Sequence, residues 1–257
     1  ASERLNDVDG AIEGWKRVLD LRGEDPEALR ALAHLYEALG RWSELTDVLE
    51  RHYDIADSDE DRVHVLSTRA RLFDEQLNRD DEALEQWQRV LDIDYSNVEA
   101  LRAIAKIWRR RGDSQELVTA LHALVDQATG QLGAEELVAA YRELGKTYGT
   151  VLEQPYEASE AWRHLLEVDG TDFEALDELE KIYRAEERWE DVVGVKMQRA
   201  AAFSDAEEKV RELLEVTELW RSPLEAYDNA TVAYDRILEV EPLHERAFKE
   251  LERLHTR

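Results

Sequence analysis

One phrase recurs four times along the chain. The stretch AIEGWKRVLD at residues 11–20 agrees at seven of ten positions with ALEQWQRVLD at residues 83–92. Related stretches begin at Ala158 (ASEAWRHLLE) and Ala230 (ATVAYDRILE), so the four copies start at almost even intervals. Four residues after each start stands a large aromatic ring: Trp15, Trp87, Trp162 and Tyr234. Internal periodicity of this kind is typical of a solenoid, in which each repeat buries its apolar face against its neighbours.

Each repeated unit contains several amphipathic segments. Its apolar residues follow the i, i+3, i+4, i+7 spacing of helices that bury one face; one such run ends at Gly40 and the next begins at Trp42. The pattern predicts four helices per unit, arranged as two helix–turn–helix modules of roughly 34–38 residues. Pro26, Pro223 and Pro242 are expected in first helical turns, where proline is tolerated. We therefore predict an all-α solenoid of about fourteen antiparallel helices.

Composition excludes several classes of protein. The 257 residues include 43% hydrophobic and 36% charged residues and no cysteine, which excludes disulfides and thiolate metal sites. The formal net charge of −27 repels nucleic acids and anionic membranes, and no apolar run approaches the length of a membrane span. We expect neither nucleic acid nor membrane as a partner. The acidic, Arg-rich composition favours a bacterial protein in the cytoplasm.

Motifs of enzyme chemistry are missing from the sequence. It contains no Gly-rich phosphate loop, HExxH motif, EF-hand loop or nucleophile elbow. No two of the seven histidines are spaced by three or four residues, as a zinc-binding helix face requires. The sequence predicts no enzymatic activity, no cofactor and no metal. A regulatory segment joined to a catalytic domain is an alternative that these residues do not test.

The modules resemble the tetratricopeptide repeat (TPR). The second helix of that family carries a small residue, an aromatic residue four positions later, a small residue three further on and then proline. Ala230, Tyr234 and Pro242 match this pattern, whereas Ile237 departs from it. The first helix carries a small residue followed three later by an aromatic one, as in the pairs Ala33/Tyr36, Ala70/Phe73 and Gly145/Tyr148.

The resemblance implies one degenerate TPR solenoid over residues 1–257. We expect a half-repeat at 7–22, full repeats at about 25–58, 59–95, 97–131, 134–170, 172–205 and 206–242, and a half-repeat at 243–257. A finished solenoid normally ends in a polar cap, and these half-repeats are not capped in this way. We therefore expect a segment of a larger TPR protein, or one whose ends associate with another copy.

The resemblance also implies a binding site, because TPR ligands usually lie in the concave groove formed by the first helices. At the corresponding positions of this chain, basic residues outnumber acidic ones. The candidate partner-binding residues are Arg102, Lys106, Arg109, Arg110, Arg142, Lys146, Lys181 and Arg184. Arginine holds carboxylates in a bidentate fork and lysine offers a point charge, so these residues favour an acidic peptide or domain as partner.

Two alternatives remain open at this stage. The basic residues could instead pair with Glu and Asp of neighbouring helices, each pair contributing about 0.3–0.5 kcal/mol. Alternatively, the chain is a structural element that stacks end to end through its terminal half-repeats into oligomers or filaments.

Overall fold

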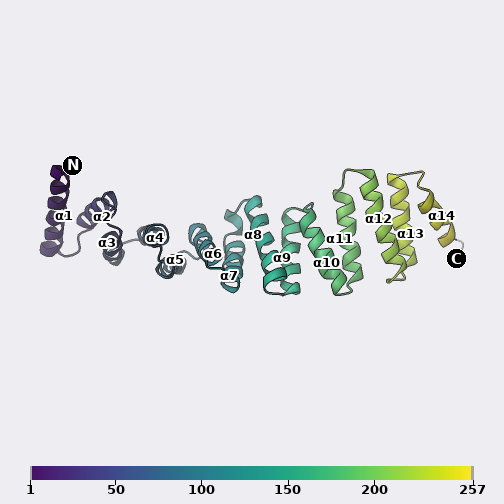
Figure 1. Ribbon diagram of the computed structural model, residues 1–257, viewed down its shortest axis with the longest axis horizontal. Helices are drawn as coiled ribbons and strands as arrows, with labels where there is room; N and C mark the ends of the chain where they lie inside the picture. Colours follow the sequence, from purple (N-terminus) through teal and green to yellow (C-terminus); the bar gives the residue numbers. More distant parts are fainter. Residues whose placement is uncertain (1, 256–257) are drawn as a thin grey trace. The chain divides into compact units, whose positions relative to one another are not determined.

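The computed structural model describes residues 2–255, and side chains for residues 8–254. This part of the chain is 82% helical, with fourteen α-helices and no strand, which confirms the all-α fold (Figure 1). Contacts divide the chain into two compact units, unit 1 (Ala1–Gln131) and unit 2 (Leu132–Arg257). The repeat boundaries and the single-solenoid organisation stay predictions, and residues 256–257 of the last half-repeat lie outside the described residues.

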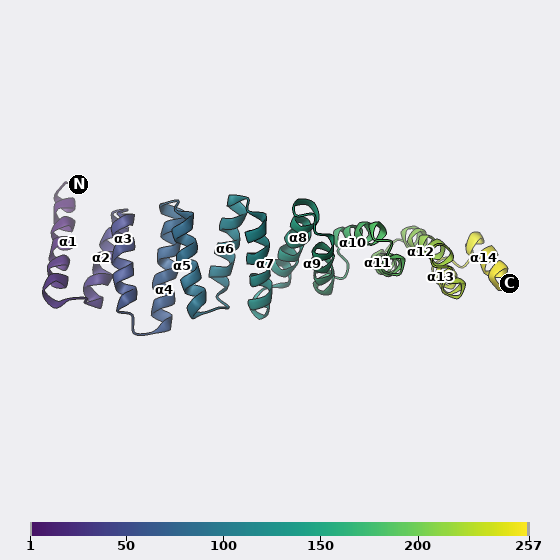
Figure 2. The ribbon, with the colours of Figure 1, turned by 90° about the horizontal axis from the view of Figure 1, so that it is seen from below.

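In each unit the helices follow one another in chain order, each packed against the one before (Figures 1 and 2). Unit 1 contains α1 (Ser2–Arg22), α2 (Pro26–Ala38), α3 (Trp42–Asp54), α4 (Asp59–Arg71), α5 (Asp80–Ile93), α6 (Val98–Arg111) and α7 (Ser114–Gln127). Unit 2 contains α8 (Ala134–Lys146), α9 (Pro155–Val168), α10 (Phe173–Ala185), α11 (Trp189–Ala202), α12 (Ala206–Arg221), α13 (Tyr227–Val240) and α14 (Glu245–His255). The described chain also has three short helical segments. The segments η1 (Leu72–Gln76) and η3 (Thr147–Val151) are π-helical, and η2 (Thr129–Gln131) is a 3₁₀ turn.

Helix starts are fixed by short polar side chains. Six helices begin after a residue whose side-chain oxygen accepts a hydrogen bond from a backbone N–H of the first turn, which satisfies a donor that the helix leaves unpaired. These residues are Asp25, Ser58, Asn97, Asp113, Asp172 and Asp205.

Pro26 begins α2 as predicted, but the same prediction is wrong for Pro223 and Pro242, which lie in the connections before α13 and α14. Those connections turn before the helix begins.

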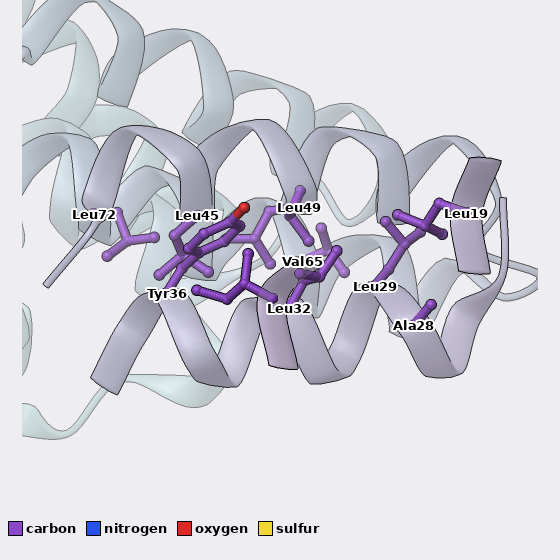
Figure 3. Close-up of a cluster of buried hydrophobic side chains, with 11 residues drawn as sticks. Leu19, Ala28, Leu29, Leu32, Tyr36, Leu45, Leu49, Val65 and Leu72 are labelled. Carbon is purple, nitrogen blue, oxygen red and sulfur yellow. The ribbon is translucent and has the colours of Figure 1, made fainter. Parts of the chain in front are cut away.

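The core of each unit is built from the faces of adjacent helices. Figure 3 shows part of unit 1, where Leu29, Leu32 and Tyr36 of α2 pack against Leu45 and Leu49 of α3. Val65 of α4 and Leu72 of η1 join the same cluster from the next hairpin. No hairpin covers its own apolar stripe completely, so stacking supplies the missing contacts and with them most of the stabilisation.

The recurring aromatic residues fill the places that the sequence predicts. Trp87, Trp162 and Tyr234 are almost fully buried, whereas Trp15 in the first copy is only half-buried. Next to Trp162 the packing is so close that only glycine fits: a Cβ at Gly145 would lie 2.5 Å from the indole ring. Gly145 lies thirteen residues before the phrase that begins at Ala158. The residue thirteen positions before the phrase that begins at Ala83 is the buried Ala70 of α4.

Two kinds of helix end alternate along the chain. Helices α2, α6 and α10 end at a residue with positive φ, namely Gly40 (64°), Gly112 (72°) and Glu187 (56°). The backbone N–H of the residue that follows donates a hydrogen bond to the carbonyl oxygen five residues earlier, as from Arg188 to Tyr183 at 2.8 Å.

At the ends of α4, α8 and α12 the corresponding bond reaches six residues back and makes a wider turn. It joins Arg79 to Phe73, Gln154 to Tyr148 and Ala226 to Trp220. The structural period is therefore two hairpins rather than one, which explains why the sequence phrase recurs only at every second hairpin.

Candidate functional site: the charged face of α6

The predicted basic residues lie on three helices in two units. Helix α6 of unit 1 carries Arg102, Lys106, Arg109 and Arg110, and all four side chains are exposed. In unit 2, α8 carries Arg142 and Lys146, and α10 carries Lys181 and Arg184. Within α6 the residues at positions 102, 106 and 110 are spaced by four, so they share one face of the helix. We call this the charged face of α6.

The wide turn after α4 delivers a carboxylate to this face. Asp74 belongs to η1, and its side chain is only 5% exposed. Its two oxygens accept hydrogen bonds from Lys106 Nζ at 3.0 Å and from Arg110 at 2.7 Å. Burial alone would raise the pKa of Asp74, but the bonds from Lys106 and Arg110 outweigh it and lower that pKa below its ordinary value. Asp74 is therefore ionised at neutral pH and shared by two cations.

The cations that share Asp74 remain accessible to solvent. The Lys106 side chain is 56% exposed and that of Arg110 is 43% exposed. Arg110 also binds Asp80, the first residue of α5, which in turn pairs with Arg111. The ammonium group has three donors and the guanidinium five, so both retain donors that these carboxylates do not occupy.

A hollow of about 240 Å³ lies beside this cluster, between η1 and α6. Its charged lining alternates in sign, and Trp87 and Ala103 form its apolar part. The charged residues are Arg71, Asp74, Glu75, Glu99, Arg102 and Lys106. Arg71 of α4 bridges to Glu99 of α6 at 3.2 Å, which ties the two helices together across the hollow.

The basic residues of unit 2 also pair with carboxylates. Arg142 pairs with Asp172 and with Glu174 at 2.9 Å, and Lys146 also pairs with Glu174, at 2.8 Å. The hydrogen bond from Lys146 lowers the pKa of Glu174 against the effect of burial. Lys181 pairs with Glu178 at 2.6 Å on the same helix. Pairing with nearby acids therefore occurs for Lys106 and Arg110 of unit 1 and for these residues of unit 2.

Arg184 leads into a buried ionic network that the sequence analysis missed. Lys196 of α11 is only 2% exposed and lies within 3.2 Å of Glu180 of α10 and 3.1 and 2.6 Å of Glu212 and Glu215 of α12. Arg199, one turn further along α11, pairs with Glu180 and Glu212. We call these residues the α11 network.

The signal for the α11 network was present in the sequence. Lys196 and Arg199 continue the apolar stripe that begins at Val192, at the i+4 and i+7 positions that face neighbouring helices. Burial raises the pKa of Glu180, but hydrogen bonds from Arg184 and Arg199 and the charge of Lys196 outweigh it and leave that pKa lowered. Glu180 is therefore ionised at neutral pH, and the network lies in the core of unit 2.

The family of these helix hairpins follows from a sequence match. Residues 28–63, which cover α2, α3 and the start of α4, match the family described as tetratricopeptide repeat. The chain therefore contains a tetratricopeptide repeat within an all-α solenoid of the TPR type. TPR proteins bind protein or peptide partners, so this chain belongs to a family of interaction scaffolds. Among residues 2–255, no helix combines the length and apolar character that crossing a membrane requires.

Solved TPR structures resemble this TPR chain at low identity. The C-terminal part of a TPR repeat-containing protein from Cytophaga hutchinsonii is 14% identical over 96% of each chain, with a TM-score of 0.43. A TPR protein from Parabacteroides merdae is 12% identical over 91% of this chain and all of its own, with a TM-score of 0.43. YrrB, a TPR protein with an unusual peptide-binding site, is 15% identical over 73% of this chain and 91% of its own, with a TM-score of 0.38. Similarity at this level does not indicate a shared partner. Comparison with curated protein sequences gives no match.

Proposed function

We propose that this TPR protein is an interaction scaffold that binds an acidic peptide segment along the charged face of α6. The observation that carries the proposal is the sharing of Asp74 by Lys106 and Arg110. Lys106 and Arg110 are still about half exposed, and although Arg110 also reaches Asp80, both cations keep donors that these carboxylates do not occupy. A peptide carboxylate supplies the missing partner without displacing Asp74.

We place the main site in unit 1 because α6 alone carries four of the eight candidate basic residues. On α8, Arg142 and Lys146 already have two carboxylates, Asp172 and Glu174, and on α10 Lys181 has Glu178. A ligand that binds these residues competes with ion pairs that already exist. We therefore assign the α8 and α10 residues to a weaker part of the same function.

Binding is tested with a labelled peptide rich in Glu and a matched peptide with Gln in place of Glu, followed by fluorescence anisotropy. The Glu peptide should bind and the Gln peptide should not, and affinity should fall as salt rises because exposed charges are screened. Replacing Arg102 and Lys106 together by Gln should weaken binding by about tenfold or more, since each charge-assisted contact contributes on the order of 1 kcal/mol.

Two controls make this result specific. Lys16→Gln removes an exposed lysine of α1 that pairs with Glu13 of its own helix, and it should leave the affinity unchanged. Circular dichroism should show the same helix content in all variants. Equal binding by the wild type and the Arg102/Lys106 variant would show that the charged face of α6 is not the site.

A second function, self-association, is favoured by one observation in unit 2. Phe248 of α14 is 57% exposed and the preceding Leu243 is 91% exposed, although both are large apolar residues. If these residues form a contact between copies, sedimentation velocity will show oligomers as concentration rises, and Phe248→Ser will abolish them. A monomer at every concentration would rule this function out.

A further inference from the structure

We infer that unit 1 has a second binding surface, on the side of α6 opposite its charged face, which takes a basic segment with one large apolar side chain. A hollow of about 440 Å³ lies where α5, α6 and α7 meet. We call it the outer hollow. It shares no residue with the charged face of α6, so this inference stands apart from the proposed function.

The geometry of α6 separates the two surfaces. Ile104 and Trp108 of α6 line the outer hollow, and they lie four residues apart on one face of the helix. Lys106 and Arg110 are offset from them by two residues and therefore point to the other side. Ligands of opposite charge can consequently bind unit 1 at the same time.

The outer hollow is lined mainly by apolar side chains. Helix α6 gives three of them and α5 and α7 two each, and those of α7 are small. They are Leu84, Leu91, Leu101, Ile104, Trp108, Ala120 and Ala123. Leu84, Leu91, Ile104, Trp108 and Ala123 keep part of their surface exposed. A large apolar side chain entering here would remove this surface, and its own, from water, which is the main driving force available to such a site.

The rim of the outer hollow is acidic, and this selects the charge of the ligand. Asp81, Glu85 and Glu116 are all exposed there. Asp81 pairs with Arg111, but Glu85 and Glu116 have no ion-pair partner among residues 8–254. Carboxylates without partners beside an apolar hollow fit Lys or Arg residues that flank an apolar one. The net charge of −27 adds long-range attraction for a basic segment.

The same place in unit 2 lacks this combination. The equivalent hollow there lies between α9, α10 and α11. That hollow has a similar volume, about 430 Å³, but Arg163 replaces Gln88 and places a cation at the rim, and Gln198 replaces Ala123 in the lining. Asp191, at the position of Glu116, is already paired with Arg188. Unit 2 is therefore a built-in negative control.

The test uses a labelled peptide of Lys and Gln residues with a single central Phe, and a second peptide with Ala in place of Phe. Fluorescence anisotropy should show binding of the Phe peptide and about tenfold or more weaker binding of the Ala peptide, because the apolar burial is lost. The double variant Glu85→Gln/Glu116→Gln, which keeps side-chain volume, should weaken the Phe peptide by a similar factor. Gln88→Arg should do the same by placing a cation at the rim, as Arg163 does in unit 2.

Controls distinguish a built site from general attraction to an acidic protein. Gln198→Ala in unit 2 should leave binding unchanged, and every variant should keep the helical circular-dichroism signal. A benzophenone-bearing residue in place of Phe should cross-link to α5–α7. Equal binding of the Phe and Ala peptides, or cross-links spread over the whole chain, would overturn the inference. Binding of the acidic peptide to the charged face of α6 should be unaffected in all these variants.

Discussion

Helices α7 and α11 hold the same place in the repeat, one in each unit, but present different chemistry. The inner face of α7 carries the buried Leu121 and Leu124, whereas the equivalent residues of α11 are the buried Lys196 and Arg199. On the outer side, each helix lines a hollow of similar volume, but Ala123 of α7 gives an apolar wall where Gln198 of α11 gives a polar one.

The comparison shows which features of the repeat are constrained. Both helices keep the alternation of packing positions, and both follow a helix that ends with the same left-handed turn, at Gly112 and Glu187. The fold requires that the inner positions be filled and compensated, and either leucines or matched charges meet that requirement. The outer positions are free of it, so they are where unit 1 and unit 2 differ in what they can bind.

The largest expected effect comes from removing one cation of the α11 network. Lys196→Leu leaves Glu180 and Glu212 buried with one cation fewer, and removing one partner of a buried ion pair costs about 3–5 kcal/mol. Urea unfolding should show this loss in the free energy of unfolding of unit 2. The matched exposed change, Lys181→Gln, should alter it by less than about 0.5 kcal/mol.

The same position also separates charge from packing. Replacing the set together, as Lys196→Leu, Arg199→Leu, Glu180→Met and Glu212→Met, gives α11 the leucines of α7 and removes both signs of charge at once. This variant should be within about 1 kcal/mol of the wild type or more stable, because apolar residues of similar volume substitute for buried ion pairs. A larger loss than in Lys196→Leu alone would mean that unit 2 depends on the charges themselves.

The second effect concerns the contact between small and aromatic residues. Gly145→Ala in unit 2 places a methyl group against the Trp162 ring and should lower the free energy of unfolding by about 1–3 kcal/mol, as overpacking usually does. Thermal unfolding measures it. Gly149→Ala is the control, because its Cβ would lie 3.6 Å from Ala158, an ordinary contact. Equal stability of the two variants would show that Trp162 moves aside at little cost.

The smallest effect concerns the shared helix end. Glu187 has φ of 56° where Gly40 and Gly112 stand in the other copies. Glu187→Gly should stabilise unit 2 by about 0.5–1 kcal/mol, because a residue with a Cβ is strained in this region. Gly112→Ala should destabilise unit 1 by a similar amount. A lower melting temperature for Glu187→Gly would contradict the equivalence of these turns.

Much of the fold could be predicted because it depends on columns of residues. The spacing of Ala83, Trp87 and Val90 and of their later copies marks the packed faces, and these residues are buried. The wide turns at η1 and η3 could not be predicted in this way. Their six-residue hydrogen bonds depend on how the chain packs after the helix, and the local sequences of the two turns, LFDEQ and TYGTV, share little.

The site was only partly predictable for a similar reason. The basic residues of α6 follow from their positions in the repeat, but their balance with acids depends on the register between helices. Asp74 takes both Lys106 and Arg110 because η1 carries it toward α6. The outer hollow is harder still, because its lining comes from three helices and includes a small residue, Ala123, on a neighbouring helix. Periodicity does not distinguish such an alanine from one that fills the core.

The most direct measurement transfers the outer hollow from unit 1 to unit 2. The variant Arg163→Gln/Val195→Ala/Gln198→Ala gives unit 2 the residues that unit 1 has at Gln88, Ala120 and Ala123. It also frees Glu160, which pairs with Arg163 and corresponds to Glu85. Isothermal titration with the basic Phe peptide should show one bound peptide per wild-type chain and two per variant chain. A variant that still binds one peptide would contradict the account.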